Sequence, residues 1–148
     1  MSKVENKLLF TFDGASEADR CAIPIPVEMM LNFEPCGVTI NIIGKAAKES
    51  AEYLKSFKRK LDNKRAALRN RGDKNWNKEL DPDEDEAFEI NLLKVIVKSW
   101  DIKTKDGKAV PCDPDNIETV FKGYPSFKTQ VMEVWAESKN FMIQPQTL

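Results

Sequence analysis

The chain has 148 residues and a formal net charge of −1, with 41% apolar and 32% charged residues. These values are typical of one folded domain with a heavily charged surface. No apolar run approaches the roughly 18 residues that cross a membrane, and the first residues lack the apolar segment of an export signal, so we expect neither a membrane span nor export. The chain has no histidine, which excludes histidine-assisted nucleophiles, histidine acid–base catalysis and histidine-containing zinc sites.

Cysteine and glycine spacing also argues against a catalytic centre. The three cysteines, Cys21, Cys36 and Cys112, are odd in number and far apart, so they form neither a disulfide framework nor a Cys-x-x-Cys motif. We expect buried or half-buried free thiols. The six glycines occur singly, so no phosphate-binding loop is present. These patterns predict no enzymatic activity, no cofactor and no metal site.

The N-terminal part is predicted to be β-structure, over residues 7–43. Apolar side chains alternate along 8–12, and a turn follows. They alternate again along 23–27, but two prolines interrupt this segment. This predicts an edge strand or an extended arm, because proline cannot donate to a ladder. A third strand is predicted over 38–42, preceded by a turn at 35–37.

The rest of the chain has mainly helical periodicity. It predicts helices at 45–70, 84–100, 113–123 and from 125 onward. The β-branched run at 95–97 leaves a strand open for the second half of the helix in which it lies. Residues 100–111 are predicted to form a short hairpin or loop that turns at Asp106-Gly107. From Phe141 onward the chain is predicted to be a tail.

The order of these elements predicts the fold class. Strands come first and helices follow, which indicates an α+β fold with a small N-terminal antiparallel sheet and a helical C-terminal half of about four helices. We expect an N-terminal β region over 1–44, a helical region over 45–142 packed with it in one domain, and a tail over 143–148.

Charge is distributed very unevenly along the chain. Residues 45–78 contain 12 Lys and Arg against 4 Asp and Glu, whereas residues 79–89 contain 7 acids and no base. Solvated helix faces are the default interpretation, and self-association is a further hypothesis. The charged interaction surface that we predict consists of Lys58, Arg59, Arg65, Arg69, Asp83 and Asp85.

The acidic segment resembles the start of a calcium loop, with Asp81, Asp83 and Asp85 at alternate positions. However, Glu86 stands where that loop needs glycine, and Leu92 stands where it needs a bidentate glutamate. We therefore reject a calcium site. The acids are better explained as a solvated loop whose last members favour the positive N-terminus of the next helix.

Aromatic residues are concentrated in the last third of the chain. Helical periodicity favours a core position for Trp100, Phe121 and Phe127. Tyr124, Trp135 and Phe141 are the candidates for exposed anchors that bind a partner, since a polar-tipped or terminal aromatic residue often marks such a site.

Several segments together resemble a recurring pattern of small proteins in tailed-phage morphogenesis modules. The pattern is a helix ending in V-x-x-W, a D-G-K-x-V-P turn, an N-I-E helix and a Y-P break into a last helix. These segments are residues 97–102, 106–111, 115–120 and 123–125, with 40–44 upstream. The chain thus resembles the tail assembly chaperones of long-tailed bacteriophages, or a related small tail-module protein.

The resemblance implies a non-enzymatic role in the host bacterial cytoplasm. Such chaperones bind the tape-measure protein, prevent its aggregation and help recruit tail-tube protein, so both proteins are the implied partners. A helix-in-groove mode needs an apolar face ringed by charge. Temporary protection needs contacts that can be displaced.

Three other interpretations stay open. The chain could be a structural tail component, which differs from a chaperone by its presence in the mature virion. It could be a phage-encoded inhibitor of a host nuclease or defence complex that mimics nucleic acid with its acidic run. It could also bind nucleic acid through residues 55–71, although no nucleic-acid motif is visible and aromatic residues are few there.

Overall fold

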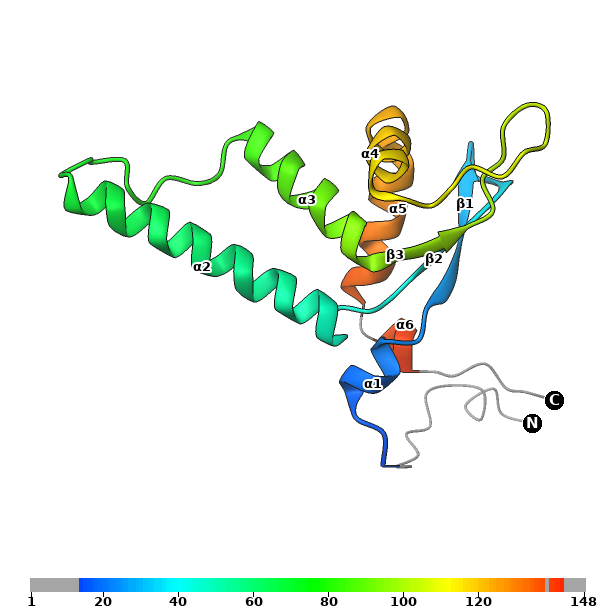
Figure 1. Cartoon of the computed structure of the whole chain (residues 1–148), viewed down its shortest axis with the longest axis horizontal. Coiled ribbons are helices and arrows are strands. Elements are labelled where there is room, and N and C mark those ends of the chain that lie inside the picture. Colours follow the sequence, from blue (N-terminus) through cyan, green and yellow to red (C-terminus); the bar gives the residue numbers. More distant parts are fainter. Residues whose placement is uncertain (1–13, 138, 143–148) are drawn as a thin grey trace.

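The computed structural model describes residues 14–137 and 139–142, and the strand predicted at 8–12 lies outside them. Figure 1 shows a small sheet with helices packed around it and one long helix reaching away. The elements in chain order are α1 (Glu17–Cys21), β1 (Ile25–Leu31), β2 (Glu34–Ile42), α2 (Lys48–Asn70), α3 (Pro82–Ile96), β3 (Val97–Trp100), α4 (Pro114–Gly123), α5 (Pro125–Ala136) and α6 (Lys139–Met142). The predicted α+β class is confirmed.

The sheet is antiparallel, with strand order β1-β2-β3. The predicted edge strand is confirmed, since within residues 14–137 and 139–142 β1 pairs with β2 alone. The turn predicted at 35–37 is wrong, because these residues lie inside β2, where Pro35 pairs with Met30. The chain instead reverses direction before β2, at Asn32-Phe33. Proline is tolerated at position 35 because the Met30–Pro35 pair is not hydrogen-bonded. The Met30 N–H and carbonyl point away from β2, to Gln130, so the N–H that Pro35 lacks is not needed for this pair.

The third strand comes from the middle of the chain. The helix predicted at 84–100 is wrong in its last four residues, because α3 ends at Ile96 and continues into β3 without a loop. The β-branched run at 95–97 therefore straddles the change, as the open alternative allowed. The Ile43 N–H donates to the Ile96 carbonyl at 3.0 Å, and Ile42 pairs with Val97. These contacts place β3 beside β2.

The start of α4 follows its predicted capping residue. Asp113 caps α4 by accepting from Asn116 N–H at 2.9 Å, with proline at the first helical position, as predicted. The predicted long helix is confirmed as α2, and the helix from 125 as α5. The predicted Asp106-Gly107 turn is also present, with Gly107 at φ +82°. The structure adds two short helices, α1 and α6.

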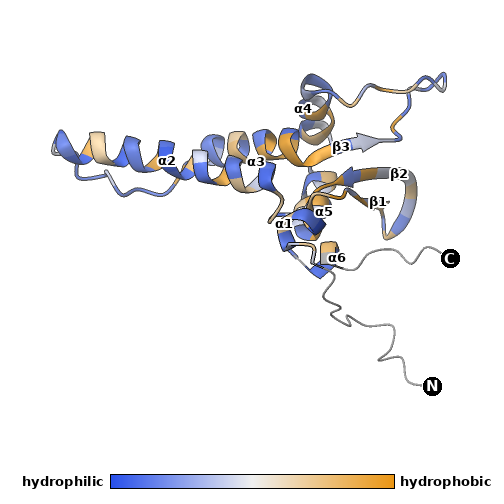
Figure 2. Cartoon of the chain, turned by 60° about the horizontal axis from the view of Figure 1, so that its bottom comes forward, coloured by the Kyte–Doolittle hydropathy of each residue, from blue (hydrophilic) through white to orange (hydrophobic). Residues whose placement is uncertain are grey.

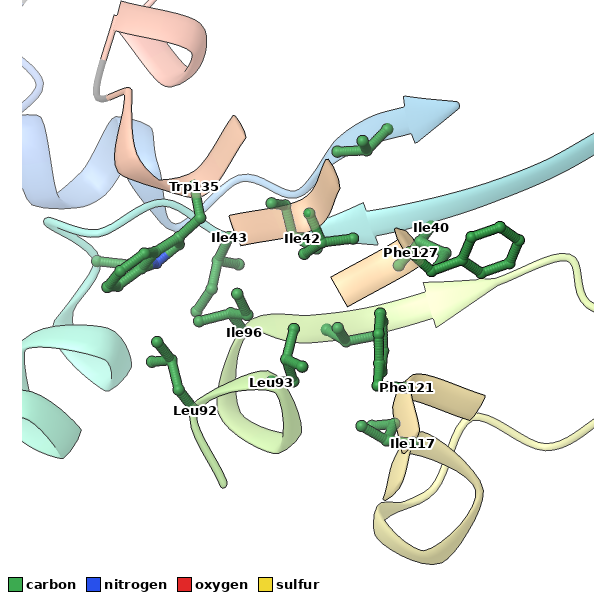
Figure 3. Packing of buried hydrophobic residues seen from close by; sticks show 14 of the residues in the cluster. Ile40, Ile42, Ile43, Leu92, Leu93, Ile96, Ile117, Phe121, Phe127 and Trp135 are labelled. Carbon is green, nitrogen blue, oxygen red and sulfur yellow. The ribbon is translucent and has the colours of Figure 1, made fainter. Parts of the chain in front are cut away.

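One apolar cluster joins the sheet to α3, α4 and α5. Figure 3 shows Ile40 and Ile42 of β2 between side chains of α5 and of the segment around Ile96. Phe121 and Phe127 are buried, as predicted. Trp100 is half-buried against this cluster, and its indole N–H donates to the Val110 carbonyl at 2.7 Å. The cluster also anchors the part of α3 nearest the sheet.

A two-helix arm extends from this body (Figure 1). We use the term arm for α2 together with the N-terminal half of α3, which runs alongside it. Phe88 of α3 lies between Tyr53 and Phe57 of α2, with ring centroids 5.7 and 4.4 Å apart. Figure 2 shows α2 to be largely hydrophilic along its length, whereas α3 becomes hydrophobic toward β3.

The C-terminal helix closes the opposite end of the body. The prediction that the chain is a tail from Phe141 onward is wrong, because Phe141 lies in α6 and is fully buried. It packs on Gly44, where an added Cβ would be 2.7 Å from Phe141 Cγ and 2.9 Å from Cys21 Cβ. Gly44 N–H also donates to the Cys21 carbonyl at 2.7 Å. Glycine is therefore required here for α1 and α6 to meet.

We predict that Gly44→Ala lowers the free energy of unfolding by about 1–3 kcal/mol, because the new methyl group overpacks a filled site. Chemical denaturation followed by circular dichroism measures this change. Gly123→Ala is the matched control, since a methyl group added there would have nothing within 4 Å and the φ of Gly123 is not positive. Equal losses in both variants would show that the contact with Phe141 is not the cause.

Candidate functional site

The tip of the β1–β2 hairpin exposes apolar side chains. Phe33 is 97% exposed, Leu31 42% and Met30 36%. We call these three residues the hairpin-tip patch. Met30 and Phe33 line one hollow, whereas Leu31, the next strand residue after Met30, points to the other face of the hairpin. Apolar side chains gathered at an exposed turn are a candidate surface for a partner. The patch is therefore the strongest candidate for a binding site among the described residues.

The turn holds Phe33 in an unfavourable backbone conformation. Leu31 pairs with Glu34, so only Asn32 and Phe33 form the loop, and their φ angles are +52° and +66°. A two-residue loop of this kind needs two left-handed residues, for which Asn-Gly is the preferred sequence. Phenylalanine has a Cβ that crowds its own backbone there. A strained, solvated aromatic residue at this position indicates that its side chain has a use.

Gln130 of α5 fixes the position of the tip. Its amide Oε1 accepts from Met30 N–H at 2.7 Å, and its Nε2 donates to the Met30 carbonyl at 2.9 Å. The side-chain amide thus occupies the place that a neighbouring strand would take at the edge of β1. Together with Met30, Asn32 and Phe33 it lines a shallow surface hollow of about 460 Å³. The patch is consequently displayed by a rigid support.

The hairpin has only acidic charge. Residues 21–44 include Glu28 and Glu34 and no lysine or arginine, and both acids are exposed. Charge of one sign beside an apolar patch favours a partner of the opposite sign and steers its approach. The hairpin-tip patch therefore suits an apolar partner surface that is flanked by basic side chains.

Tyr124 is the one predicted anchor that is exposed, at 54%. Its ring stacks on Phe127 at 5.1 Å. Residues 124, 127 and 130 follow one another at helical spacing, so Tyr124 precedes Gln130 by about 9 Å along the α5 axis. Tyr124 is thus an accessible aromatic residue at the N-cap of the helix that supports the hairpin tip.

The prediction of Trp135 and Phe141 as exposed anchors is wrong. Trp135 is 6% exposed and Phe141 is fully buried. Trp135 lies in the last turn of α5, near Ile43 in Figure 3. Lys45 Nζ is 5.6 Å from the centroid of its ring. These aromatic residues are buried because α5 and α6 fold back onto the N-terminal elements, a contact that helical periodicity does not reveal.

The predicted charged surface is located on the arm. Lys58, Arg59, Asp83 and Asp85 are exposed there. The other two residues are engaged within the arm: Arg65 Nη2 donates to the Lys78 carbonyl at 3.4 Å, and the Arg69 guanidinium lies 5.2 Å from the Trp76 ring centroid. The structure therefore places these residues on the two helices of the arm, away from the hairpin-tip patch.

Part of the acidic segment serves the helix that follows. Asp81 is the N-cap of α3 and forms a capping box with Glu84, as expected for acids near a helix N-terminus. The Glu84 backbone N–H bonded to the Asp81 carboxylate lowers the pKa of that carboxyl group. Glu84 also pairs with Lys64 at 2.8 Å. A nearby cavity of about 250 Å³ is lined by residues of both charge signs.

Other candidate chemistries find little support in the part of the chain that is described. Cys21 is buried, Cys36 and Cys112 are half-buried, and all three are free thiols, as predicted. Burial raises the pKa of the Cys21 and Cys112 thiols, which disfavours the reactive thiolate. Within residues 14–137 and 139–142 no group of potential ligands could hold a metal ion, and no helix is long and apolar enough to span a membrane.

Comparisons with protein-family models, curated proteins and solved structures find no match for this chain. The candidate binding site is therefore supported by the geometry of this structure alone. Sequence reasoning missed Met30, Leu31, Phe33 and Gln130. The one available signal was Asn32, a turn residue between two apolar runs, because asparagine tolerates left-handed backbone.

We predict that Phe33→Gly raises the free energy of unfolding by about 0.5–1 kcal/mol, because it relieves the left-handed strain and loses almost no buried surface. Denaturant titration measures the change. Asn32→Gly is the matched control. Its free energy of unfolding should rise by less, since asparagine already tolerates this conformation. A destabilised Phe33→Gly variant would mean that the ring packs within the fold and is no free anchor.

Proposed function

We propose that this chain is a non-enzymatic phage tail assembly chaperone that binds the tape-measure protein and aids tail-tube assembly in the host bacterial cytoplasm. The resemblance of its motifs to that family suggests the role. The observation that carries the proposal is the hairpin-tip patch, where Phe33 is 97% exposed in a strained conformation. Selection for stability alone favours glycine there, whereas selection for binding favours an aromatic side chain.

The chemistry of the patch suits a helical partner. Aromatic and aliphatic anchors insert between the apolar side chains that recur along one helix face. Glu28 and Glu34 beside the patch complement lysine or arginine at the border of such a face. A long helical protein that must be kept soluble offers many such sites, so several chaperone copies can cover it.

The size of the patch supports temporary binding. Three side chains at one hairpin bury much less than the roughly 800 Å² per partner of a stable interface. Each contact is therefore weak enough for a tube subunit to displace. Multiple copies along one partner compensate for the weak single contact by multivalency.

The acidic-mimicry alternative is less well supported. Asp81 and Glu84 are engaged in the capping box, and Glu84 also pairs with Lys64, whereas Asp83, Asp85 and Glu86 are exposed. Removing Asp81 would disturb α3 as well as any partner. A structural tail component would use the same hairpin-tip patch, and it is separated from a chaperone by whether the chain remains in purified virions.

We predict that the wild-type chain, co-expressed with the tape-measure protein of its own phage, keeps that protein soluble and is recovered with it. Substituting both Leu31→Ser and Phe33→Ser should weaken the recovered complex by about tenfold or more, because the two anchors are lost. Affinity pull-down from the soluble fraction, with quantified partner, measures the effect.

The matched control is Ile23→Ser, which also removes an exposed apolar side chain, 48% exposed, outside the patch. It should leave recovery unchanged. If the tape-measure protein stays insoluble with the wild-type chain, the chaperone function is wrong. If the double variant binds as well as the control, the role can stand but the hairpin-tip patch is not its site.

A further inference from the structure

The arm has two outer sides of opposite charge. The side of α2 that packs on α3 includes Tyr53, Phe57 and Lys64. Helix geometry therefore turns Lys55 and Arg59 away from α3. Both side chains are exposed. Glu52 and Asp62 also lie on this side, and Glu52 is 4.0 Å from Lys48. Lys55, Lys58 and Arg59 outnumber Asp62 over residues 55–62, so the outer side of α2 is net basic over this stretch.

The matching side of α3 is acidic. Phe88 and Glu84 face α2 through the ring contacts and the pair with Lys64. Asp83 and Glu86 therefore lie on the side of α3 turned away from α2, and both are exposed. The two helices thus form a two-layer element with a basic outer face and an acidic outer face.

One pair of these opposite charges, Arg59 and Glu86, lies at the same level along the arm. The two helices are antiparallel, with Lys64 beside Glu84 and Phe57 beside Phe88. Arg59 and Glu86 both fall between these two contacts. A second arm placed alongside the first, in the same orientation, would bring Glu86 of one copy to the level of Arg59 in the other.

The charges on both faces are free to bind. Among the described residues, no ion-pair or hydrogen-bond partner is found for Lys55, Lys58, Arg59, Asp83 or Glu86. Nearer the body the acids and bases of α3 are paired within the chain, through Glu89 with Lys128 at 3.1 Å and Lys94 with Glu118 at 2.8 Å. Unpaired charge is therefore present on both outer faces of the arm.

We propose that two copies of this chain associate side by side through their arms, with the basic outer face of α2 in one copy on the acidic outer face of α3 in the next. The contact is heterologous, because it joins two different faces. It leaves one basic and one acidic face open at the ends, so further copies can add to form a ring or an open array.

A second copy fits these faces better than nucleic acid does. Phosphate binding would use the basic face alone and would leave the acidic face, on the far side of the arm, without a partner. A second copy satisfies both faces with one contact. Nucleic-acid binding through residues 55–71 thereby becomes the competing outcome of the test.

The experiment exchanges charge between the two faces. The first variant, K55E/R59E, has two acidic faces, and the second, D83K/E86K, has two basic faces. Each should be monomeric alone, because like charges would meet. An equimolar mixture should associate in alternation and restore the wild-type behaviour. Sedimentation velocity over a range of concentrations, at about 0.05 M and about 0.5 M salt, measures the average mass.

We expect the wild-type mass to rise with concentration at low salt and to fall toward that of the monomer at high salt. The variant K103E/K105E is the matched control, since it changes net charge as K55E/R59E does but at exposed residues of the 101–111 loop. It should associate like the wild type. Circular dichroism of each variant checks that the helices are retained.

Three results would overturn the proposal. The wild-type chain could remain monomeric at low salt and high concentration, the mixture could remain monomeric, or the control could lose association as fully as the arm variants. Binding of an added DNA or RNA duplex that K55E/R59E abolishes, with no protein self-association, would assign the basic face to nucleic acid. The L31S/F33S double variant should self-associate normally, so this test is independent of the proposed chaperone site.

Discussion

The pairing of β3 with β2 is the constraint on which the rest of the structure depends. Because α3 passes into β3 without a loop, the direction of the strand also sets the direction of the helix. The Ile42–Val97 pair and the bond from Ile43 N–H to the Ile96 carbonyl lock this junction. The arm is therefore held at a defined angle to the sheet, and α4 and α5 complete the core around the junction.

The packing of the same core explains which surfaces remain exposed for binding. The largest aromatic side chains of α5 and α6 are used to hold the N-terminal elements, which leaves Trp135 and Phe141 inaccessible. Exposed apolar surface remains at the tip of the β1–β2 hairpin, where the Gln130 side chain is hydrogen-bonded to the Met30 backbone beside the turn. The arm has few apolar side chains to offer, and its outer faces carry charge. The two proposed surfaces thus differ in chemistry, one apolar and one ionic, and they occupy different elements.

This separation has a functional consequence under the two proposals. A chaperone that binds a long partner through the hairpin-tip patch gains affinity when neighbouring copies also contact one another. Ionic contacts between arms are weak and sensitive to salt. They can therefore assist assembly along a partner without producing stable aggregates of the chaperone alone.

Local physics determined much of this protein from the sequence alone. Helix starts were predictable because Asp113 and the proline after it are chemically suited to caps, and the edge position of β1 followed from its prolines. Tertiary structure decided the rest. Whether the β-branched run at 95–97 continued as helix or began a strand depended on the free edge of β2. Burial of Trp135 and exposure of Phe33 depended on which elements meet, because periodicity identifies an apolar side chain and only packing decides whether it is covered.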